Sequence, residues 1–128
     1  MTFNAHIRPI FSDTCFACHG FDPKTRKENL RLDTPEGAYA KLKDSDLHAI
    51  VPGKPDESAI LTHMFSDDPE KIMPPPDSHK TLKPAEIALL ERWVAEGAEY
   101  QPHWALIAPA RAPVPKISNA KAKSENPI

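Results

Sequence analysis

The sequence predicts a small all-α domain. Its clearest element is a helix that begins at Pro84 and ends before Gly97, because proline is favoured in a first helical turn and glycine just after the last. Two other stretches, 4–14 and 56–65, place apolar residues three or four positions apart, which is the helical period. With 128 residues, of which 40% are hydrophobic and 7% aromatic, the chain is expected to form one domain with a modest core.

The first expected helix covers residues 4–14. It carries Ile7, Ile10 and Phe11 at helical spacing, and Pro9 is compatible with it only near a first turn. Residues 20–29 are polar and basic and include a proline, so they are expected to form a loop.

The middle of the chain predicts two shorter elements. Leu30 and Leu32 alternate with polar residues, which favours a brief extended piece leading into a helix start at residues 34–36. Asp56 follows a turn at 51–55 and is expected to cap a further helix. One face of that helix is predicted to carry its apolar residues, Ile60, Leu61, Met64 and Phe65.

The last predicted helix, from Pro84 onward, has Ile87, Leu90 and Val94 on one stripe. Beyond Trp104 the sequence becomes rich in Ala and Pro and then in Lys, Ser and Asn, with few large apolar side chains. We therefore expect a domain over residues 1–105 and a Pro-rich, irregular linker over residues 106–128.

A Cys-x-x-Cys-His pentapeptide at residues 15–19 carries the main chemical signal. On a helical turn, Cys15 and Cys18 lie on the same side, so each thiol can form a thioether with one haem vinyl group. His19 then lies under the ring as the proximal iron ligand. The motif predicts one covalently attached haem c per chain, with the helices packed around it.

Three other interpretations of the cysteine pair have less support. A thioredoxin-like pair should follow a strand of a βαβ unit, and no strongly apolar strand precedes Cys15. A structural zinc site needs four ligands, whereas His48 and His63 stand apart from the motif. A simple disulfide would leave His19 without a role.

Met73 is the expected ligand on the opposite face of the iron. It is followed by three prolines, which hold the chain extended and allow a loop to present the thioether at little entropic cost. Met64 competes for this role, although its apolar neighbours indicate a core position. The histidines other than His19 are expected to be solvent-facing or hydrogen-bonded, and His79 is the one to examine because it lies near the Met73 loop.

The order of these motifs resembles a planctomycete-type cytochrome c domain. The resemblance rests on residues 15–19, the run at 30–34, the run at 73–78 and Trp93, and it extends over about residues 3–105. It implies a class I-like mono-haem fold, in which the N- and C-terminal helices cross beside the haem and His19 and Met73 are the axial ligands. It also implies a position near the start of a much larger exported protein.

Two positions depart from the pattern of that family. Lys83 replaces the more usual Thr cap, which predicts a helix start weaker by about 1 kcal/mol. His79 replaces a small residue and adds a possible ligand near the iron.

The function expected from these features is electron transfer by an electron carrier rather than catalysis by an enzyme. The expected partner is a redox protein or a downstream domain of the same polypeptide. An alternative is a haem domain with a displaceable sixth ligand that binds a gas or a peroxide.

The net charge of −2 gives no reason to expect binding to nucleic acid, and no run of roughly 18 to 20 apolar residues predicts a membrane span. Haem c is as a rule attached outside the cytoplasm, so we expect a periplasmic or otherwise exported protein. Residues 1–9 do not resemble a signal peptide, which suggests an excised domain.

Overall fold

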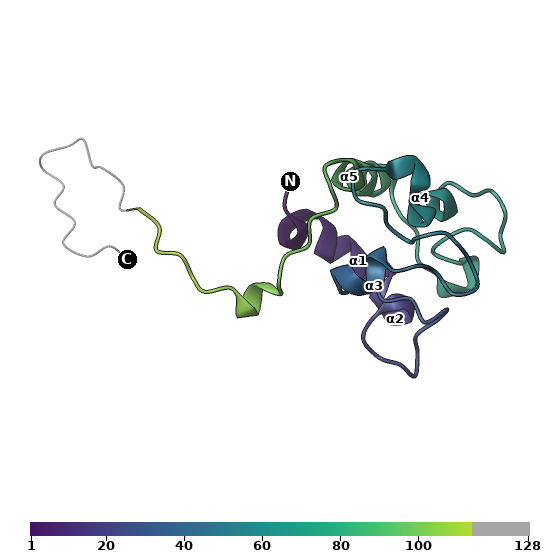
Figure 1. Ribbon diagram of the computed structural model, residues 1–128, viewed down its shortest axis with the longest axis horizontal. Helices are drawn as coiled ribbons and strands as arrows, with labels where there is room; N and C mark the ends of the chain where they lie inside the picture. The colour runs from purple at the N-terminus through teal and green to yellow at the C-terminus, as the bar shows by residue number, and fades with distance from the viewer. Residues whose placement is uncertain (114–128) are drawn as a thin grey trace, which may run out of the picture.

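Short helices gathered around one core make up the molecule, and an extended C-terminal segment leaves them (Figure 1). The computed structural model describes residues 1–113. The longer helices are α1 (Arg8–Thr14), α4 (Ala59–Met64) and α5 (Pro84–Ala95). The shorter elements are η1 (Phe3–Ile7), α2 (Phe16–His19), α3 (Pro35–Tyr39), η2 (Pro55–Glu57), η3 (Pro76–Ser78) and η4 (Trp104–Leu106). Within the described residues there is no strand, which confirms the all-α prediction.

The predicted helix at residues 4–14 is present as η1 followed directly by α1. In η1 the turn is wider than in an α-helix, and the N–H of Arg8 donates to the carbonyl of Phe3, five residues earlier. Pro9 follows at the start of α1, where its missing N–H leaves no helical hydrogen bond unmade. The wide turn therefore lets one continuous segment pass through the proline and reach the cysteine motif.

The segment between the motif and α3 is irregular. Residues 20–29 form the predicted loop, but Leu30 and Leu32 do not belong to a strand. The predicted start of α3 is confirmed, since the Thr34 hydroxyl accepts a hydrogen bond from the N–H of Gly37 at 3.3 Å.

Helix α4 differs from the prediction at both ends. Asp56 does not cap it, because Pro55 starts the separate turn η2 and α4 begins only after Ser58. Ser58 is fully buried, and its hydroxyl accepts from the N–H of Val51 at 2.9 Å. At the other end Phe65 lies beyond the helix and is 59% exposed, so its predicted place on the apolar face is wrong.

Helix α5 begins and ends as predicted. Its first turn is supported by Glu86, whose carboxylate accepts a hydrogen bond from the N–H of Lys83 at 2.7 Å. This contact satisfies the N–H of Lys83, which is one half of a capping box.

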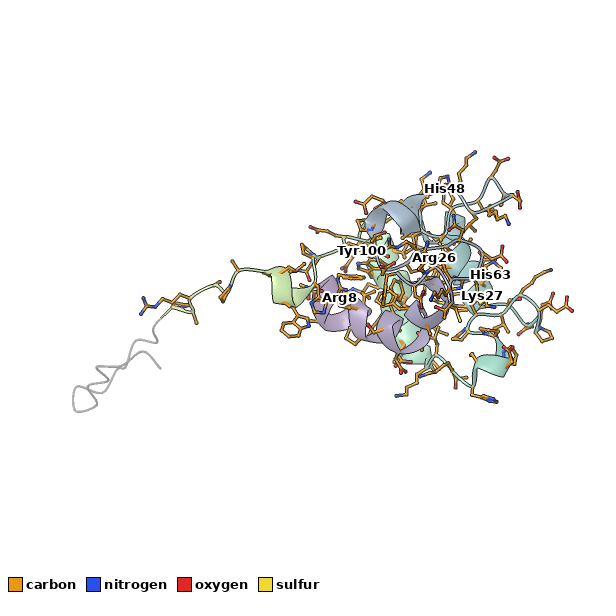
Figure 2. All side chains as sticks on the ribbon, turned by 90° about the horizontal axis from the view of Figure 1, so that it is seen from below. Arg8, Arg26, Lys27, His48, His63 and Tyr100 are labelled. Atoms are coloured by element: carbon orange, nitrogen blue, oxygen red, sulfur yellow. The ribbon has the colours of Figure 1, made fainter. Side chains whose placement is uncertain are left out.

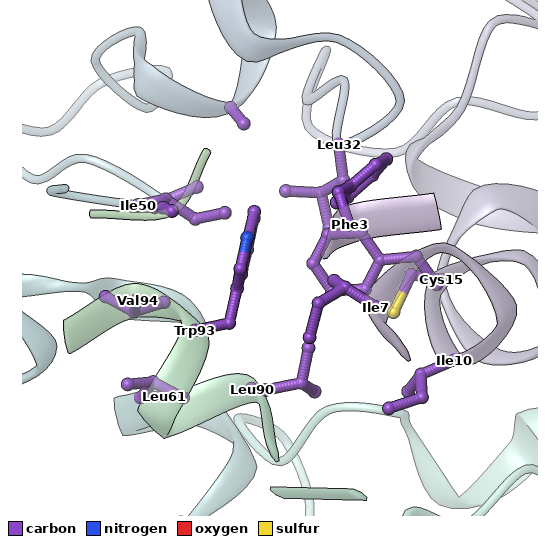
Figure 3. Close-up of a cluster of buried hydrophobic side chains, with 14 of the residues drawn as sticks. Phe3, Ile7, Ile10, Cys15, Leu32, Ile50, Leu61, Leu90, Trp93 and Val94 are labelled. Carbon is purple, nitrogen blue, oxygen red and sulfur yellow. The ribbon is translucent and has the colours of Figure 1, made fainter. Parts of the chain in front are cut away.

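The core lies where the N-terminal helices meet α5, and its side chains are shown in Figure 3. Phe3 is central to it: its ring lies 5.6 Å from that of Trp93 and 4.3 Å from that of Tyr100. Helices from the two ends of the domain therefore pack against each other, as the family resemblance implies. Each aromatic pair adds about 0.5–1.5 kcal/mol to the burial of its rings.

After α5 the chain follows the N-terminal helices and then leaves the domain. Trp104 and Leu106 in η4 are 67% and 81% exposed, and residues 107–113 have no regular structure. Of the linker predicted for residues 106–128, residues 106–113 are in the described part of the chain and residues 114–128 lie outside it. None of the helices in residues 1–113 has the length and hydrophobicity needed to cross a bilayer.

Candidate functional site

One apolar cavity of about 330 Å³ brings the predicted site residues together. Cys15, Cys18 and His19 line it, and so does Met73, which lies 54 positions after His19 in the sequence. Most of the remaining lining residues are apolar: Leu30, Leu32, Leu42, Leu47, Ala49, Ala59, Ile60, Met64, Pro74, Pro75 and Leu82. Its volume lies at the lower end of the range of about 300–1,000 Å³ found for ligand pockets.

Helix α2 sets the positions of the two thiols. The N–H groups of Cys18 and His19 both donate to the carbonyl of Cys15, at 3.1 and 2.8 Å. This turn places both cysteines toward the cavity, and the structure shows them as free thiols rather than a disulfide. The disulfide interpretation of the motif therefore has no support.

The thiol of Cys15 is enclosed by the core. Only 9% of the residue is exposed, and this burial raises the pKa of Cys15 to about 11, against a smaller opposing effect of the Thr14 hydroxyl 3.3 Å away. At neutral pH the group is a protonated thiol on the cavity wall.

His19 contributes its imidazole to the cavity wall. Its carbonyl accepts from the N–H of Leu32 at 2.8 Å, which fixes its main chain. Burial lowers the pKa of His19, against smaller opposing effects of the Lys27 backbone and Glu28, so the ring is neutral at pH 7. Its Nδ1 is buried and has no partner among the described residues. A neutral imidazole with an unpaired nitrogen beside two thiols is a ligand available to a metal.

Gly20 allows the chain to turn immediately after the motif. A Cβ atom at this position would collide with the carbonyl oxygen of Phe16, a backbone atom that no side-chain rotation can move away. Any larger residue would therefore displace the end of α2 and with it His19.

The loop at 20–29 folds back over the motif. The N–H of Lys27 donates to the carbonyl of Cys18 at 2.7 Å, and the Arg26 guanidinium donates to the carbonyls of Gly20 and Phe21 at 2.9 and 2.7 Å. Figure 2 shows Arg26 and Lys27 on the part of the domain away from the tail, whereas Arg8 and Tyr100 lie where the tail leaves.

Met73 reaches the cavity from a loop with several anchors. Its N–H donates to the carbonyl of His63 at 3.1 Å, and Pro74, Pro75 and Ser78 line the cavity after it. The Ser78 hydroxyl donates to the carbonyl of Pro75 at 2.6 Å. Farther along, the Lys80 ammonium lies 2.9 Å from the Asp13 carboxylate of α1, which ties the loop to the N-terminal helix.

The alternative ligands lie at different places relative to the cavity. Met64 lines the cavity but is only 7% exposed and belongs to the core, as its sequence neighbours indicate. His79 is exposed and does not line the cavity. His63 does line it, which the sequence gave no reason to expect beyond its position next to Met64 on a helix.

This donor set fits a covalently held haem. A porphyrin needs an apolar cavity, two thiols at i and i+3 for its vinyl groups and nitrogen or sulfur ligands for its iron, and the cavity wall supplies each of these. Residues 1–113 contain no group of three or more His, Cys, Asp or Glu side chains arranged for a metal ion, so the zinc interpretation finds no set of four ligands in that range.

Comparison with known protein families gives one match. Residues 15–77, about half of the chain, match the family model described as planctomycete cytochrome C. The matched segment begins at Cys15 and includes His19 and Met73. No curated protein and no solved structure was found to match the chain.

Proposed function

Because residues 15–77 belong to the planctomycete cytochrome c family, we propose that this chain transfers electrons through one haem c bound to Cys15 and Cys18, with His19 and Met73 as the axial ligands. The family and the Cys-x-x-Cys pair imply the haem and the electron transfer. The choice of axial ligands is our proposal.

One observation carries the assignment of the ligands. His19 and Met73 are far apart in the sequence, yet both line the same apolar cavity, together with both thiols. Each is also held by its main chain, His19 through Leu32 and Met73 through His63, at 2.8 and 3.1 Å. Ligands that are fixed in this way lose little conformational freedom on binding iron.

The residues of the chain have distinct tasks in this mechanism. When bound, the haem supplies an iron that alternates between the ferric and ferrous states. Cys15 and Cys18 would hold the ring, and His19 and Met73 would both ligate the iron, so that no substrate would reach the metal. A thioether in place of a second histidine stabilises the ferrous form. The aliphatic lining excludes water, which favours the less charged ferrous state further.

We propose that the domain over residues 1–105 serves a redox partner or a downstream domain of the same polypeptide, joined through the linker at 106–128. The domain itself would be an electron carrier rather than an enzyme. A periplasmic or otherwise exported location agrees with this proposal, because c-type cytochromes generally function outside the cytoplasm.

Absorption spectra of the matured, haem-loaded protein test the proposal. The expected result is a low-spin haem c with the long-wavelength methionine-to-iron band in the ferric state and no response of the reduced protein to carbon monoxide. A high-spin spectrum or ready binding of carbon monoxide would contradict it and would support the alternative function, a haem domain that binds a gas or a peroxide.

The Met73→Ala variant tests the distal ligand itself. It should keep its covalent haem, lose the methionine-to-iron band and bind imidazole at least about tenfold more tightly, since the competing thioether is gone. Met64→Leu is the matched control, because Met64 lines the same cavity from the core. Loss of the band in the control, with the band retained in Met73→Ala, would assign the ligand to Met64 instead.

A further inference from the structure

His63, at the end of α4, is bonded twice to the loop that carries Met73. Its carbonyl accepts from the N–H of Met73 at 3.1 Å. Its ring Nδ1 lies 2.7 Å from the carbonyl of Lys71, two residues before Met73. Main chain and side chain of one residue thus hold the same short segment, and the residue itself lines the cavity.

The ring bond fixes the orientation of the imidazole. A carbonyl oxygen can only accept, so the hydrogen between the two groups must be on Nδ1 of His63. The ring of His63 is therefore the donor and the carbonyl of Lys71 the acceptor, and the bond holds Lys71 close to α4.

Few other contacts are available to hold the segment at 66–72. Its side chains are exposed or half-buried, and none belongs to the core. The N–H groups of Lys71 and Ile72 donate to the carbonyl of Asp68 at 2.9 and 2.8 Å, which shapes the loop internally. The N–H of Ser66 donates to the carbonyl of His63 at 3.4 Å, which attaches only the first residue of the segment to α4.

We propose that His63 is a positioning residue that holds the Met73 thioether at the iron through the bond from its ring to Lys71. The inference rests on the proposed function, since it takes Met73 as the distal ligand. Without the ring bond, the main-chain bond to Met73 is the one hydrogen bond among the described residues that ties residues 71–73 to α4, and the thioether would leave the iron more often.

Three variants of the haem-loaded protein test this role. His63→Leu removes the donor while keeping a side chain of similar size. His63→Asn keeps an N–H donor at nearly the position of Nδ1. His48→Leu is the matched control, because the Nδ1 of His48 also lies 2.7 Å from a backbone carbonyl, that of Tyr39, but His48 does not line the cavity.

The measurements are the methionine-to-iron band of the ferric protein and its titration with imidazole. For His63→Leu we expect a weaker band and an affinity for imidazole about five- to tenfold higher than in the wild type, the effect of one lost hydrogen bond on the closed loop. His63→Asn should restore the wild-type values, and His48→Leu should match the wild type in both. Equal affinities in His63→Leu and His48→Leu would overturn the proposal.

Met73→Ala separates this inference from the assignment of the ligand. If it binds imidazole no better than the wild type, Met73 is not the ligand and the proposed ligation fails. If it binds tightly while His63→Leu is unchanged, the ligation stands and the role of His63 fails.

The double variant Met73→Ala/His63→Leu should equal Met73→Ala, because a positioning residue acts only through the group it positions. A low-spin Met73→Ala protein that becomes high-spin only in the double variant would make His63 a ligand itself and would also overturn the proposal.

Discussion

The carboxylate of Asp33 contributes to the pH dependence of the stability of the domain. The guanidinium of Arg31 donates from Nε to Oδ1 of Asp33 at 3.0 Å, and the carboxylate is only 16% exposed. This hydrogen bond holds the pKa of Asp33 below its usual value, although burial acts in the opposite direction. A lowered pKa in the folded state means that the pair stabilises the fold above the unfolded pKa of about 3.9. That stabilisation is lost as the pH falls through the lower, folded pKa.

Replacement of this carboxylate should remove part of the acid sensitivity. We expect Asp33→Asn to lower the free energy of unfolding at pH 7 by about 1 kcal/mol, the order of a partly exposed charged hydrogen bond. The difference from the wild type should shrink below about pH 4. Denaturant unfolding of the haem-loaded protein between pH 2.5 and 7 measures both effects. Asp46→Asn is the control, because its carboxylate is 98% exposed in its pair with Lys41. A constant difference at all pH values would contradict the assignment.

At the scale of elements, α3 depends on a glycine that helix propensity alone would disfavour. Gly37 lies in the middle of this short helix, where alanine is normally better by about 1 kcal/mol. A Cβ at this position would lie 2.5 Å from Cβ of Arg31 and 2.7 Å from its carbonyl oxygen. These atoms belong to or adjoin the backbone, so a change of rotamer cannot relieve the contact.

Packing should therefore outweigh propensity in Gly37→Ala. Overpacking costs about 1–3 kcal/mol, so after a gain of about 1 kcal/mol in propensity we expect a net loss of up to about 2 kcal/mol in the free energy of unfolding. Thermal unfolding should show a Tm lower by up to about 10 °C. Glu36→Ala, an exposed change in the same helix, should stay within about 0.5 kcal/mol of the wild type. A Gly37→Ala protein more stable than the wild type would show that the chain relaxes away from Arg31.

The elements predicted correctly from the sequence are those whose signals are local. Pro84, Gly97 and Thr34 act on the turn in which they lie, so the bounds of α5 and the start of α3 follow from them. The start of α4 did not follow in this way. The hydroxyl of the buried Ser58 is bonded to the main chain of Val51, seven residues earlier. No local sequence pattern indicates that contact. Phe65 fits the apolar face of α4 in the sequence pattern, but the helix ends at Met64, one residue before it.

In the site, too, the sequence predicted the residues with local signals but not those that depend on contacts between distant segments. The cysteine motif has a fixed spacing, so the sequence alone indicated the positions of Cys15, Cys18 and His19. That His63 lines the cavity depends instead on how α4 packs beside the Met73 loop, a contact made only after the chain folds. The sequence predicted only that His63 would be solvent-facing or hydrogen-bonded, and the hydrogen bond to Lys71 confirms the second of these.

At the scale of the whole molecule, the segment after α5 completes the core. The Tyr100 hydroxyl donates to the carbonyl of Leu32 at 2.9 Å, and Leu32 in turn donates its N–H to His19. Gln101 is bonded to the N-terminal helices, accepting from the N–H of Asn4 at 3.0 Å and from the Arg8 guanidinium at 2.9 Å. Residues after 106 in the described part of the chain are exposed and have no regular structure. The structural domain should therefore end between Gln101 and the start of the predicted linker.

Truncation locates that end. The chain 1–106 keeps every contact named above, so we expect its haem-loaded form to unfold within about 2 °C of the full chain. The chain 1–98 lacks Tyr100, whose ring packs against Phe3, Trp93 and Tyr39. Loss of a large aromatic side chain from a core costs about 3–5 kcal/mol, which corresponds to a Tm lower by more than about 10 °C. Thermal unfolding followed by far-UV circular dichroism measures both. If 1–106 were destabilised as much as 1–98, residues beyond 106 would belong to the domain, and the predicted boundary at 105 would be wrong.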